Sequence, residues 1–397
     1  MHSFLLISIL IAVLNIAPAD STVASPIFGL ARALMDFMAT KAETAEDSLA
    51  VGILQQTLGA VESGDKDAVI APIKEIAKQV DTVDRGAILP AGTDTAFISR
   101  MNPQTFFLNL PAANYSGITA VGIEGLEGDF LLVDDKSATE GFRKVHLTFD
   151  SNGQISALRD DGFVPASTGA VSTDGEGIAY DPRRGTVLIA REASNEVLEF
   201  HLDGRATSRY LHTASYFPVN GNAGLESLSY NNITGRFWTT TEGIPEGEEA
   251  VRLQSYAAYF WPLGHWLYRP DRAEVRKPGA IYVHGVSEIC ALDDGSLLVL
   301  EREANIPGTS ISEAAGAFVT CKLYRVVPSN AKRGKVLDKH LITRFETYAL
   351  DLSFANYEGM CLGPVLPDDR RVLILVSDSQ AGYKGVLRDW FRTIVLK

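Results

Sequence analysis

Cysteine is scarce in this sequence: three of the 397 residues, Cys290, Cys321 and Cys361, are cysteines. So few cysteines in so long a chain exclude a disulfide scaffold, and a hydrophobic core must supply the stability. Their spacing fits no zinc-binding pattern. In an oxidising compartment the simplest count is one disulfide and one remaining thiol, and the sequence does not identify the pair.

An excess of basic charge is also absent, since the formal net charge is −13. Nucleic acids and anionic membrane surfaces bind to a basic face, so neither is expected as a partner. An acidic chain is suited instead to cationic partners, metal ions included.

The common catalytic motifs are missing as well. The sequence contains no Gly-x-Ser-x-Gly elbow, no His-Glu-x-x-His, no phosphate-binding glycine loop that ends in Lys-Ser or Lys-Thr, and no Arg-His-Gly. The histidines are scattered and form no motif. If the chain is a hydrolase, the expected nucleophile is a metal-bound water, with a glutamate as the base.

Long apolar runs are confined to the N-terminus, where residues 4–16 are apolar and Ala17-Pro18-Ala19 offers a cleavage site before Asp20. This pattern predicts a signal peptide over residues 1–19 and a secreted, extracellular protein, with a retained anchor as the alternative. No second long apolar run follows, so no membrane span is expected after signal removal. The sequons at Asn114 and Asn232 are consistent with a secreted glycoprotein.

Two regions with different sequence patterns follow. Residues 25–83 begin with Ser25-Pro26 and carry apolar residues at helical spacing, which predicts a helical N-terminal segment with no candidate site. From residue 86 to 397, short strand-like runs alternate with Asp, Asn, Gly and Pro turns, which is typical of an all-β fold.

Internal repeats identify the all-β fold as a β-propeller. Five segments place an acid at the start of a buried strand and a second acid after the next strand; the starting acids are Glu124, Glu176, Glu226, Glu288 and Glu358. Repeats of this length with four strands each are typical of propeller blades. The last repeat has one strand too few, so a strand from residues 86–110 is expected to complete it and remove the exposed edge.

The repeated acid predicts a site on the propeller axis. The first strand of each blade lines the central channel, so the five glutamates are expected to converge at its mouth. Clustered carboxylates repel one another unless a cation is present, and hard oxygen ligands suit Ca²⁺. Asn222 and Asn356 add amide oxygens nearby. The alternative is structural: each glutamate accepts backbone hydrogen bonds and holds neighbouring blades together.

A second set of acids ends the second strands: Asp134, Glu192, Glu242, Glu301 and Asp378. Two of them have a neighbouring arginine, Arg191 and Arg302. Because a guanidinium matches phosphate or carboxylate oxygens, these arginines are the candidate contacts for a substrate anion. Arg–Glu pairing between blades is the alternative.

The segments "DGEGIAYDPRRGTVLIARE", "NAGLESLSY", "LLVLERE", "NYEGMCLGP" and "LILVSDS" together resemble the phytase-like domain family (esterase-like activity of phytase), over residues 110–397. The resemblance implies a propeller, usually six-bladed, and Ca²⁺-assisted hydrolysis of phosphoesters or esters. It maps onto Asp174, Glu176, Asn222, Glu226, Glu301, Arg302, Asn356, Glu358 and Asp378. The sequence departs from the family at Ser227, where glycine is usual, and at 378–380, where Asp-Ser-Gln replaces Asp-Asn-Asn.

Three functions are consistent with these observations. The first is a secreted Ca²⁺-assisted hydrolase of a small anionic or ester substrate. Its predicted catalytic residues are Glu176, Glu226 and Glu358, its metal ligands Glu124, Glu176, Glu226, Glu288, Glu358 and Asp378, and its substrate contacts Arg191, Arg302, Asn222 and Asn356. The second is a metal-dependent sugar lactonase. The third is a non-catalytic propeller that binds a ligand or a protein.

Overall fold

The computed structural model describes residues 82–83, 89–171, 174–213, 224–308, 313, 316–349, 353–382 and 387–397. The predicted signal peptide lies outside the described residues. So does the predicted helical segment, except for the short strand β1 (Thr82–Val83).

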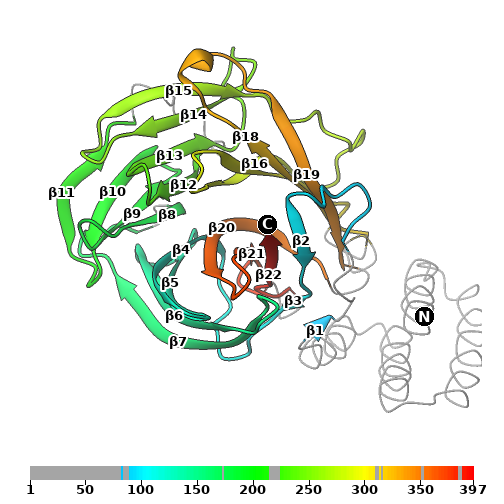
Figure 1. Ribbon diagram of the computed structural model, residues 1–397, viewed down its shortest axis with the longest axis horizontal. Helices are drawn as coiled ribbons and strands as arrows, with labels where there is room; N and C mark the ends of the chain where they lie inside the picture. The colour runs from blue at the N-terminus through cyan, green and yellow to red at the C-terminus, as the bar shows by residue number, and fades with distance from the viewer. Residues whose placement is uncertain are drawn as a thin grey trace, which may run out of the picture.

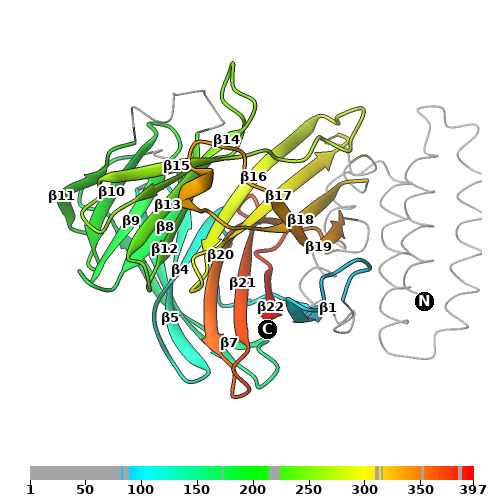
Figure 2. The ribbon, with the colours of Figure 1, turned by 45° about the horizontal axis from the view of Figure 1, so that its top comes forward.

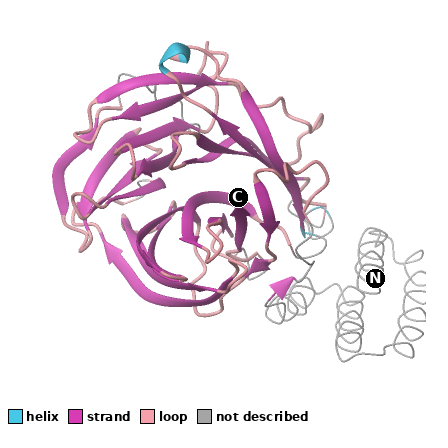
Figure 3. Cartoon of the chain, viewed as in Figure 1, coloured by secondary structure: helices cyan, strands magenta, loops and turns pink. Residues whose placement is uncertain are grey.

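The regular secondary structure of the described chain is almost entirely strand (Figure 3). The first blade contains β4 (Tyr115–Glu124), β5 (Glu127–Asp134), β6 (Gly141–Phe149) and β7 (Ile155–Pro165). The second contains β8 (Gly175–Asp181), β9 (Thr186–Arg191), β10 (Glu196–His201) and β11 (Ala206–Leu211). The third contains β12 (Leu225–Asn231), β13 (Arg236–Thr241), β14 (Val251–Tyr256) and β15 (Pro262–Tyr268).

The fourth blade contains β16 (Ile281–Ala291), β17 (Leu297–Ile306), β18 (Phe318–Val326) and β19 (Lys339–Tyr348), with the 3-10 helix η1 (Asn330–Lys332) between the last two strands. The fifth contains β20 (Asn356–Val365), β21 (Arg371–Asp378) and β22 (Phe391–Leu396), extended by β2 (Ile98–Met101), β3 (Gln104–Thr105) and β1.

The first strands of the blades form the hub. Strands β4, β8, β12, β16 and β20 each pack against the next, and β20 packs against β4 to close the ring. Figure 1 shows the red C-terminal strands beside the cyan strands of the first blade, and Figure 2 shows the same neighbours from another side. The propeller is therefore a closed ring of five blades.

The fifth blade is completed from the N-terminal side, as the short last repeat predicted. Strand β2 pairs antiparallel with β22, with Ile98 opposite Leu396 and Met101 opposite Ile394. Thr105 of β3 lies opposite Phe391. The early strand thus covers the edge of the last one and joins the two ends of the ring.

The described residues form five blades, so the count of five repeats was right and the six blades implied by the family resemblance were wrong. The longer spacings before Glu288 and Glu358 do not contain another sheet. They are taken up by the long strands of the fourth blade and by its loops. Residues 98–105 contribute to the fifth blade and do not form a blade of their own.

Strands in the middle of a blade are apolar on both faces because each sheet packs between two others. Leu298 and Leu300 of β17 pack toward Leu373 of the fifth blade. Leu297 and Val299, which point the other way, pack toward the third blade. This arrangement explains the continuous apolar runs in the sequence.

The three cysteines are buried free thiols, so the expected disulfide was wrong. Of the two sequon asparagines, Asn114 is buried and Asn232 is exposed. Within the described part of the chain, no helix is long and apolar enough to cross a membrane.

Candidate functional site

The five inner strands share a four-residue stretch at the channel mouth: 115–118, 175–178, 225–228, 286–289 and 357–360. In each, the pairing with the second strand shifts register at the second residue, which is a β-bulge. We call this second residue the hub position. It is occupied by Ser116, Glu176, Glu226, Ser287 and Glu358. The mouth therefore carries three glutamates and two serines, where five glutamates were expected.

Two of the predicted acids lie elsewhere. Glu124 is exposed at the far end of β4, opposite Glu127 in the hairpin to β5. Its expected position at the mouth was wrong because the repeat was aligned on the wrong end of that strand. Glu288 lies one residue beyond the hub position, opposite Leu300.

The residue after the hub position explains why glycine follows the glutamates. Neighbouring inner strands approach so closely there that a Cβ on Gly117 would lie 2.5 Å from the carbonyl oxygen of Glu176. A Cβ on Gly177 would lie 2.5 Å from the backbone nitrogen of Leu228. Glycine is thus required at Gly117 and Gly177 by the packing of adjacent blades and not by the chemistry of the acid, whereas the third and fourth blades carry Ser227 and Glu288 at this position.

In the fourth blade, Glu288 occupies the position that glycine occupies in the first, second and fifth blades. Its Oε1 accepts the backbone N–H of Ile289 at 2.9 Å. The backbone N–H groups of Leu228 and Met360, from both neighbouring blades, also point at this carboxyl. Burial nevertheless raises the pKa of Glu288 well above its usual range. Glu288 therefore holds blades together, as the structural alternative predicted for a hub glutamate.

The second strands end in another ring of side chains. In each blade, the first residue of the shared stretch pairs with a residue of the second strand, and the ring residue comes directly after that partner. The ring residues are Asp135, Glu192, Glu242, Arg302 and Asp378. Asp134 and Glu301 were predicted in this ring, but the positions belong to the next residues, Asp135 and Arg302. A shift of one residue along a strand turns the side chain to the other face of the sheet. Glu301 instead accepts from Nζ of Lys339 at 2.7 Å.

Arg302 is buried among three carboxylates. Its Nη2 donates to Oε1 of Glu242 at 2.9 Å and to Oε1 of Glu226 at 3.2 Å. Its Nη1 donates to Oδ1 of Asn356 at 2.8 Å and to Oε1 of Glu358. The guanidinium thus joins the third, fourth and fifth blades, and the predicted substrate contact is instead an internal ion pair.

Arg191 also forms an ion pair between blades. Its Nε and Nη2 donate to the two carboxylate oxygens of Glu140 at 2.6 Å each. This pair lies on the opposite face of β9 from the ring that contains Glu192. The structure does not bring Arg191 to the channel mouth, and Asn222 lies outside the described residues.

The acids that do converge form what we call the acid cluster: Asp135, Asp174, Glu176, Glu192, Glu226, Glu242, Glu358 and Asp378. Arg302 and Lys136 are the cations beside it. Burial and mutual repulsion raise the pKa of Glu176 and of Glu226 well above the usual range. The same causes raise the pKa of Glu192 to about 7 and that of Asp378 to about 6.

One group within the acid cluster has the geometry of a cation site. Carboxylate oxygens of Asp135, Asp174 and Glu176 all lie within 4.8 Å of one another. Asp135 Oδ1 is buried and has no hydrogen-bond partner. The Oδ1 of Asn114, a residue whose backbone oxygen accepts the N–H of Asp135 at 3.1 Å, is likewise buried without a partner. These two buried oxygens are hard ligands, and neither accepts a hydrogen bond.

Lys136 lies at the edge of this group. Its Nζ donates to Asp135 Oδ2 at 2.7 Å, while its side chain remains 58% exposed. The repeats did not single out Asp135, Lys136 or Asn114. Aligning "DD" at 134–135 with "RE" at 191–192 would have identified Asp135, whereas nothing in the sequence pattern indicated Asn114.

Comparisons with known proteins agree with the fold. The model of the phytase-like family, described as "Esterase-like activity of phytase", matches residues 111–380. No curated protein gives a significant match. Similar solved structures include the calcium-binding protein regucalcin from Agrobacterium tumefaciens, with 12% identity, a TM-score of 0.35, and 73% of this chain and 92% of that chain covered.

Two further structures are similar at the same level. The α-L-arabinofuranosidase from Podospora anserina, in complex with cellotriose, has 10% identity and a TM-score of 0.36, covering 72% of this chain and 95% of that chain. The hydrazine synthase of Kuenenia stuttgartiensis has 8% identity and a TM-score of 0.34, covering 72% and 88%. TM-scores this low support no inference about activity.

Proposed function

Because the chain belongs to the phytase-like family, we propose that it is an exported, Ca²⁺-assisted hydrolase of phosphoesters or esters that works at the acid cluster. One observation carries the proposal: three carboxylates, those of Asp135, Asp174 and Glu176, converge within 4.8 Å beside a buried oxygen that has no partner. Export is supported by the apolar run at residues 4–16.

The residues present fit a calcium ion. Asp135, Asp174 and Glu176 supply carboxylate oxygens, and Asn114 Oδ1 supplies a neutral one. Ca²⁺ accepts six to eight oxygen ligands in irregular geometry, so a site assembled from separate loops suits it. When bound, the ion would polarise the phosphoryl or carbonyl oxygen of a substrate and offset the negative charge of the acid cluster.

Glu192 is the residue best placed to accept a proton. It lies close enough to Glu176 to raise the pKa of that residue, and its own pKa is raised to about 7. A carboxylate with a pKa near the operating pH is an effective general base. Its Oε1 accepts the backbone N–H of Gly224 at 3.0 Å, which fixes the orientation of the side chain.

Lys136 takes the role of substrate contact that the sequence assigned to Arg191 and Arg302. Its ammonium group is next to the ion-binding carboxylates and is accessible from solvent. The hub glutamates Glu226 and Glu358 are held by Arg302 and act as supports. Asn356 supports them too, since it both accepts from Arg302 and donates to Glu358.

The proposal is tested with purified, chelator-treated protein, titrated with CaCl₂ and assayed on p-nitrophenyl phosphate and p-nitrophenyl acetate. Wild type should bind Ca²⁺ and release p-nitrophenol only when the ion is present. Asp174→Asn and Glu176→Gln should lose both properties. Glu124→Gln is the matched control, because this residue was predicted as a ligand but lies outside the acid cluster, and it should keep both.

Three outcomes would overturn the proposal. Hydrolysis that persists in chelator shows that no calcium ion is needed. Calcium binding without turnover of either substrate leaves the non-catalytic propeller as the better description. Opening of sugar lactones without release of p-nitrophenol from either ester identifies the lactonase alternative.

A further inference from the structure

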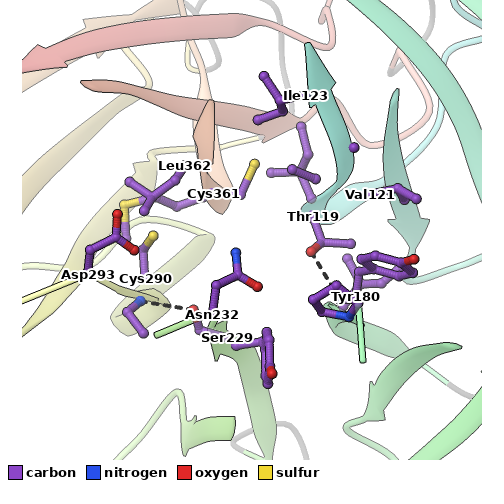
Figure 4. A pocket seen from close by; sticks show the side chains of 18 of the residues that line it. Thr119, Val121, Ile123, Tyr180, Ser229, Asn232, Cys290, Asp293, Cys361 and Leu362 are labelled. Atoms are coloured by element: carbon purple, nitrogen blue, oxygen red, sulfur yellow. Dashed lines mark hydrogen bonds between the residues drawn. The ribbon is translucent and has the colours of Figure 1, made fainter. Parts of the chain in front are cut away.

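A cavity with a volume of about 470 Å³ lies on the propeller axis, at the other end from the acid cluster. Its walls come from the later halves of the inner strands β4, β8, β12, β16 and β20, beyond the level of Glu288. Figure 4 shows residues of several blades around it, among them Thr119, Tyr180, Ser229 and Cys290. We call it the lower pocket.

The lower pocket is separate from the acid cluster. Between them the inner strands are in close contact at their glycines, where a Cβ on Gly359 would lie 3.0 Å from Cα of Gly117. The buried carboxyl of Glu288 occupies the same level. The two ends of the axis are therefore different sites, and the inference below does not depend on the proposed hydrolase.

The shape of the lower pocket is fixed by bonds between blades. The backbone N–H of Tyr180 donates to Oγ1 of Thr119 at 3.2 Å, and that of Ala291 donates to Oγ of Ser229 at 2.9 Å (Figure 4). Both bonds link the inner strands of adjacent blades. A cavity of this size with walls fixed in advance is typical of sites for small molecules.

The lining combines apolar side chains with polar groups and includes a single cation. The apolar part contains Ile118, Ile178, Leu228, Met360 and Leu362. Arg371, at the start of β21, is the one Lys or Arg among the described lining residues.

Arg371 differs from its neighbour in its partners. The half-buried Arg370 forms an ion pair with Asp368, with Nε and Oδ2 at 2.8 Å. By contrast, no carboxylate of the described residues pairs with Arg371, and its buried Nε has no hydrogen-bond partner. Asp293, the one acid among the described lining residues, is exposed and forms no ion pair with it. A half-buried guanidinium that lines the lower pocket and has no carboxylate partner among the described residues is available to pair with an anion.

We propose that the lower pocket binds a small organic acid, with its carboxylate on Arg371 and its apolar body against the half-buried side chains of Leu362, Val121 and Ile123. A guanidinium pairs with a carboxylate through two parallel hydrogen bonds, which fixes the orientation of the ligand. The hydroxyl groups of Tyr180 and Ser229 line the same space but carry no charge. The ligand is therefore an amphipathic anion and not a polyphosphate.

The test uses octanoate and its neutral counterpart octanamide as probes, with binding measured by isothermal titration calorimetry. Wild type should bind octanoate more tightly than octanamide. Arg371→Gln should weaken octanoate binding at least about tenfold, the effect of losing a hydrogen bond to a charged group. Arg370→Gln is the matched control and should bind octanoate as wild type does.

Octanamide also reports whether the Arg371→Gln variant keeps its fold. Its affinity should be the same in wild type and in both variants, because it does not need the guanidinium. Arg371→Lys keeps the charge but not the paired donors, so its octanoate affinity should lie between those of wild type and Arg371→Gln. Equal octanoate affinity in wild type and Arg371→Gln, or no preference for octanoate over octanamide in wild type, would overturn the proposal.

Discussion

The Nη2 of Arg302 lies 2.9 Å from Oε1 of Glu242, and this bond joins the fourth blade to the third at the channel mouth. Glu242 occupies the same position in its blade as Arg302 does in the next. One cation therefore replaces one acid in a ring that would otherwise be made of carboxylates alone. The same guanidinium also bonds to Glu226 and Glu358, so three buried acids depend on it.

Arg302→Met should be strongly destabilising, because it leaves three buried carboxylates without their cation. Removing one partner of a buried ion pair typically costs about 3–5 kcal/mol, and urea denaturation at pH 7 would measure the loss. Burial already raises the pKa of Glu358 to about 8 and that of Glu226 well above its usual range. The loss should therefore be larger at pH 9 than at pH 7, because these acids are more fully ionised there and the variant leaves their buried charge unpaired.

The control for this variant is Arg205→Met, because Arg205 pairs with Asp203 on the open surface, where the two side chains are 71% and 54% exposed. Its denaturation midpoint should equal that of wild type within error. Equal midpoints for Arg302→Met and wild type would contradict the account of the ring.

The fold could be predicted from the sequence because its signals are local and repeated. A turn, an apolar strand and an acid recur five times, and the missing strand of the last repeat identified the contribution of β2. The site was harder because its position depends on the register of each strand. Each inner strand has a bulge where it pairs with the second strand, and this bulge decides which residue faces the axis. The residue types in the sequence do not reveal where a bulge occurs.

The contacts that each charged side chain makes were the least predictable part of the site. The sequence "ERE" at 301–303 places three charges in a row, yet only Arg302 turns to the axis while Glu301 and Glu303 bond to residues of the loop before β16. The motif shows that charges are present. The register of the strand and the positions of the neighbouring blades decide which of these charged side chains contact one another.

Gly177→Ala should destabilise the hub by overpacking. The added Cβ would lie 2.5 Å from the backbone nitrogen of Leu228, which cannot move away as a flexible side chain could. Overpacking of this kind typically costs about 1–3 kcal/mol, which equilibrium unfolding in urea would detect. Gly122→Ala is the matched control, since nothing lies within 4 Å of its Cβ. If both variants unfold at the wild-type midpoint, adjacent inner strands are not in the contact described here.

Acid should remove the contribution of Asp271 to stability. Hydrogen bonds from Lys339, Tyr324 and Lys322 outweigh burial and lower the pKa of Asp271. Because the folded pKa is below the unfolded one, the stabilisation is present at neutral pH and is lost as pH falls below about 4, the ordinary value for Asp.

The difference in unfolding free energy between wild type and Asp271→Asn should therefore be constant from pH 8 to 5 and shrink below pH 4. Asp338→Asn provides the comparison, because Asp338 is 94% exposed and pairs with Lys332 on the surface. A difference between wild type and Asp271→Asn that grows on acidification would have the wrong sign for a lowered pKa.

Closure of the ring by the N-terminal strands predicts a sharp boundary for truncation. A variant without residues 1–88 loses only the two-residue strand β1 from the fifth blade and keeps β2 and β3, so β22 remains paired. A variant without residues 1–106 loses Ile98, which is fully buried, and exposes the edge of β22. An unpaired edge promotes association between chains, so this variant should aggregate in light scattering and unfold at lower urea. The shorter truncation should remain monodisperse with a near-native midpoint; if the two behave alike, the pairing of β2 with β22 is not what holds the ring closed.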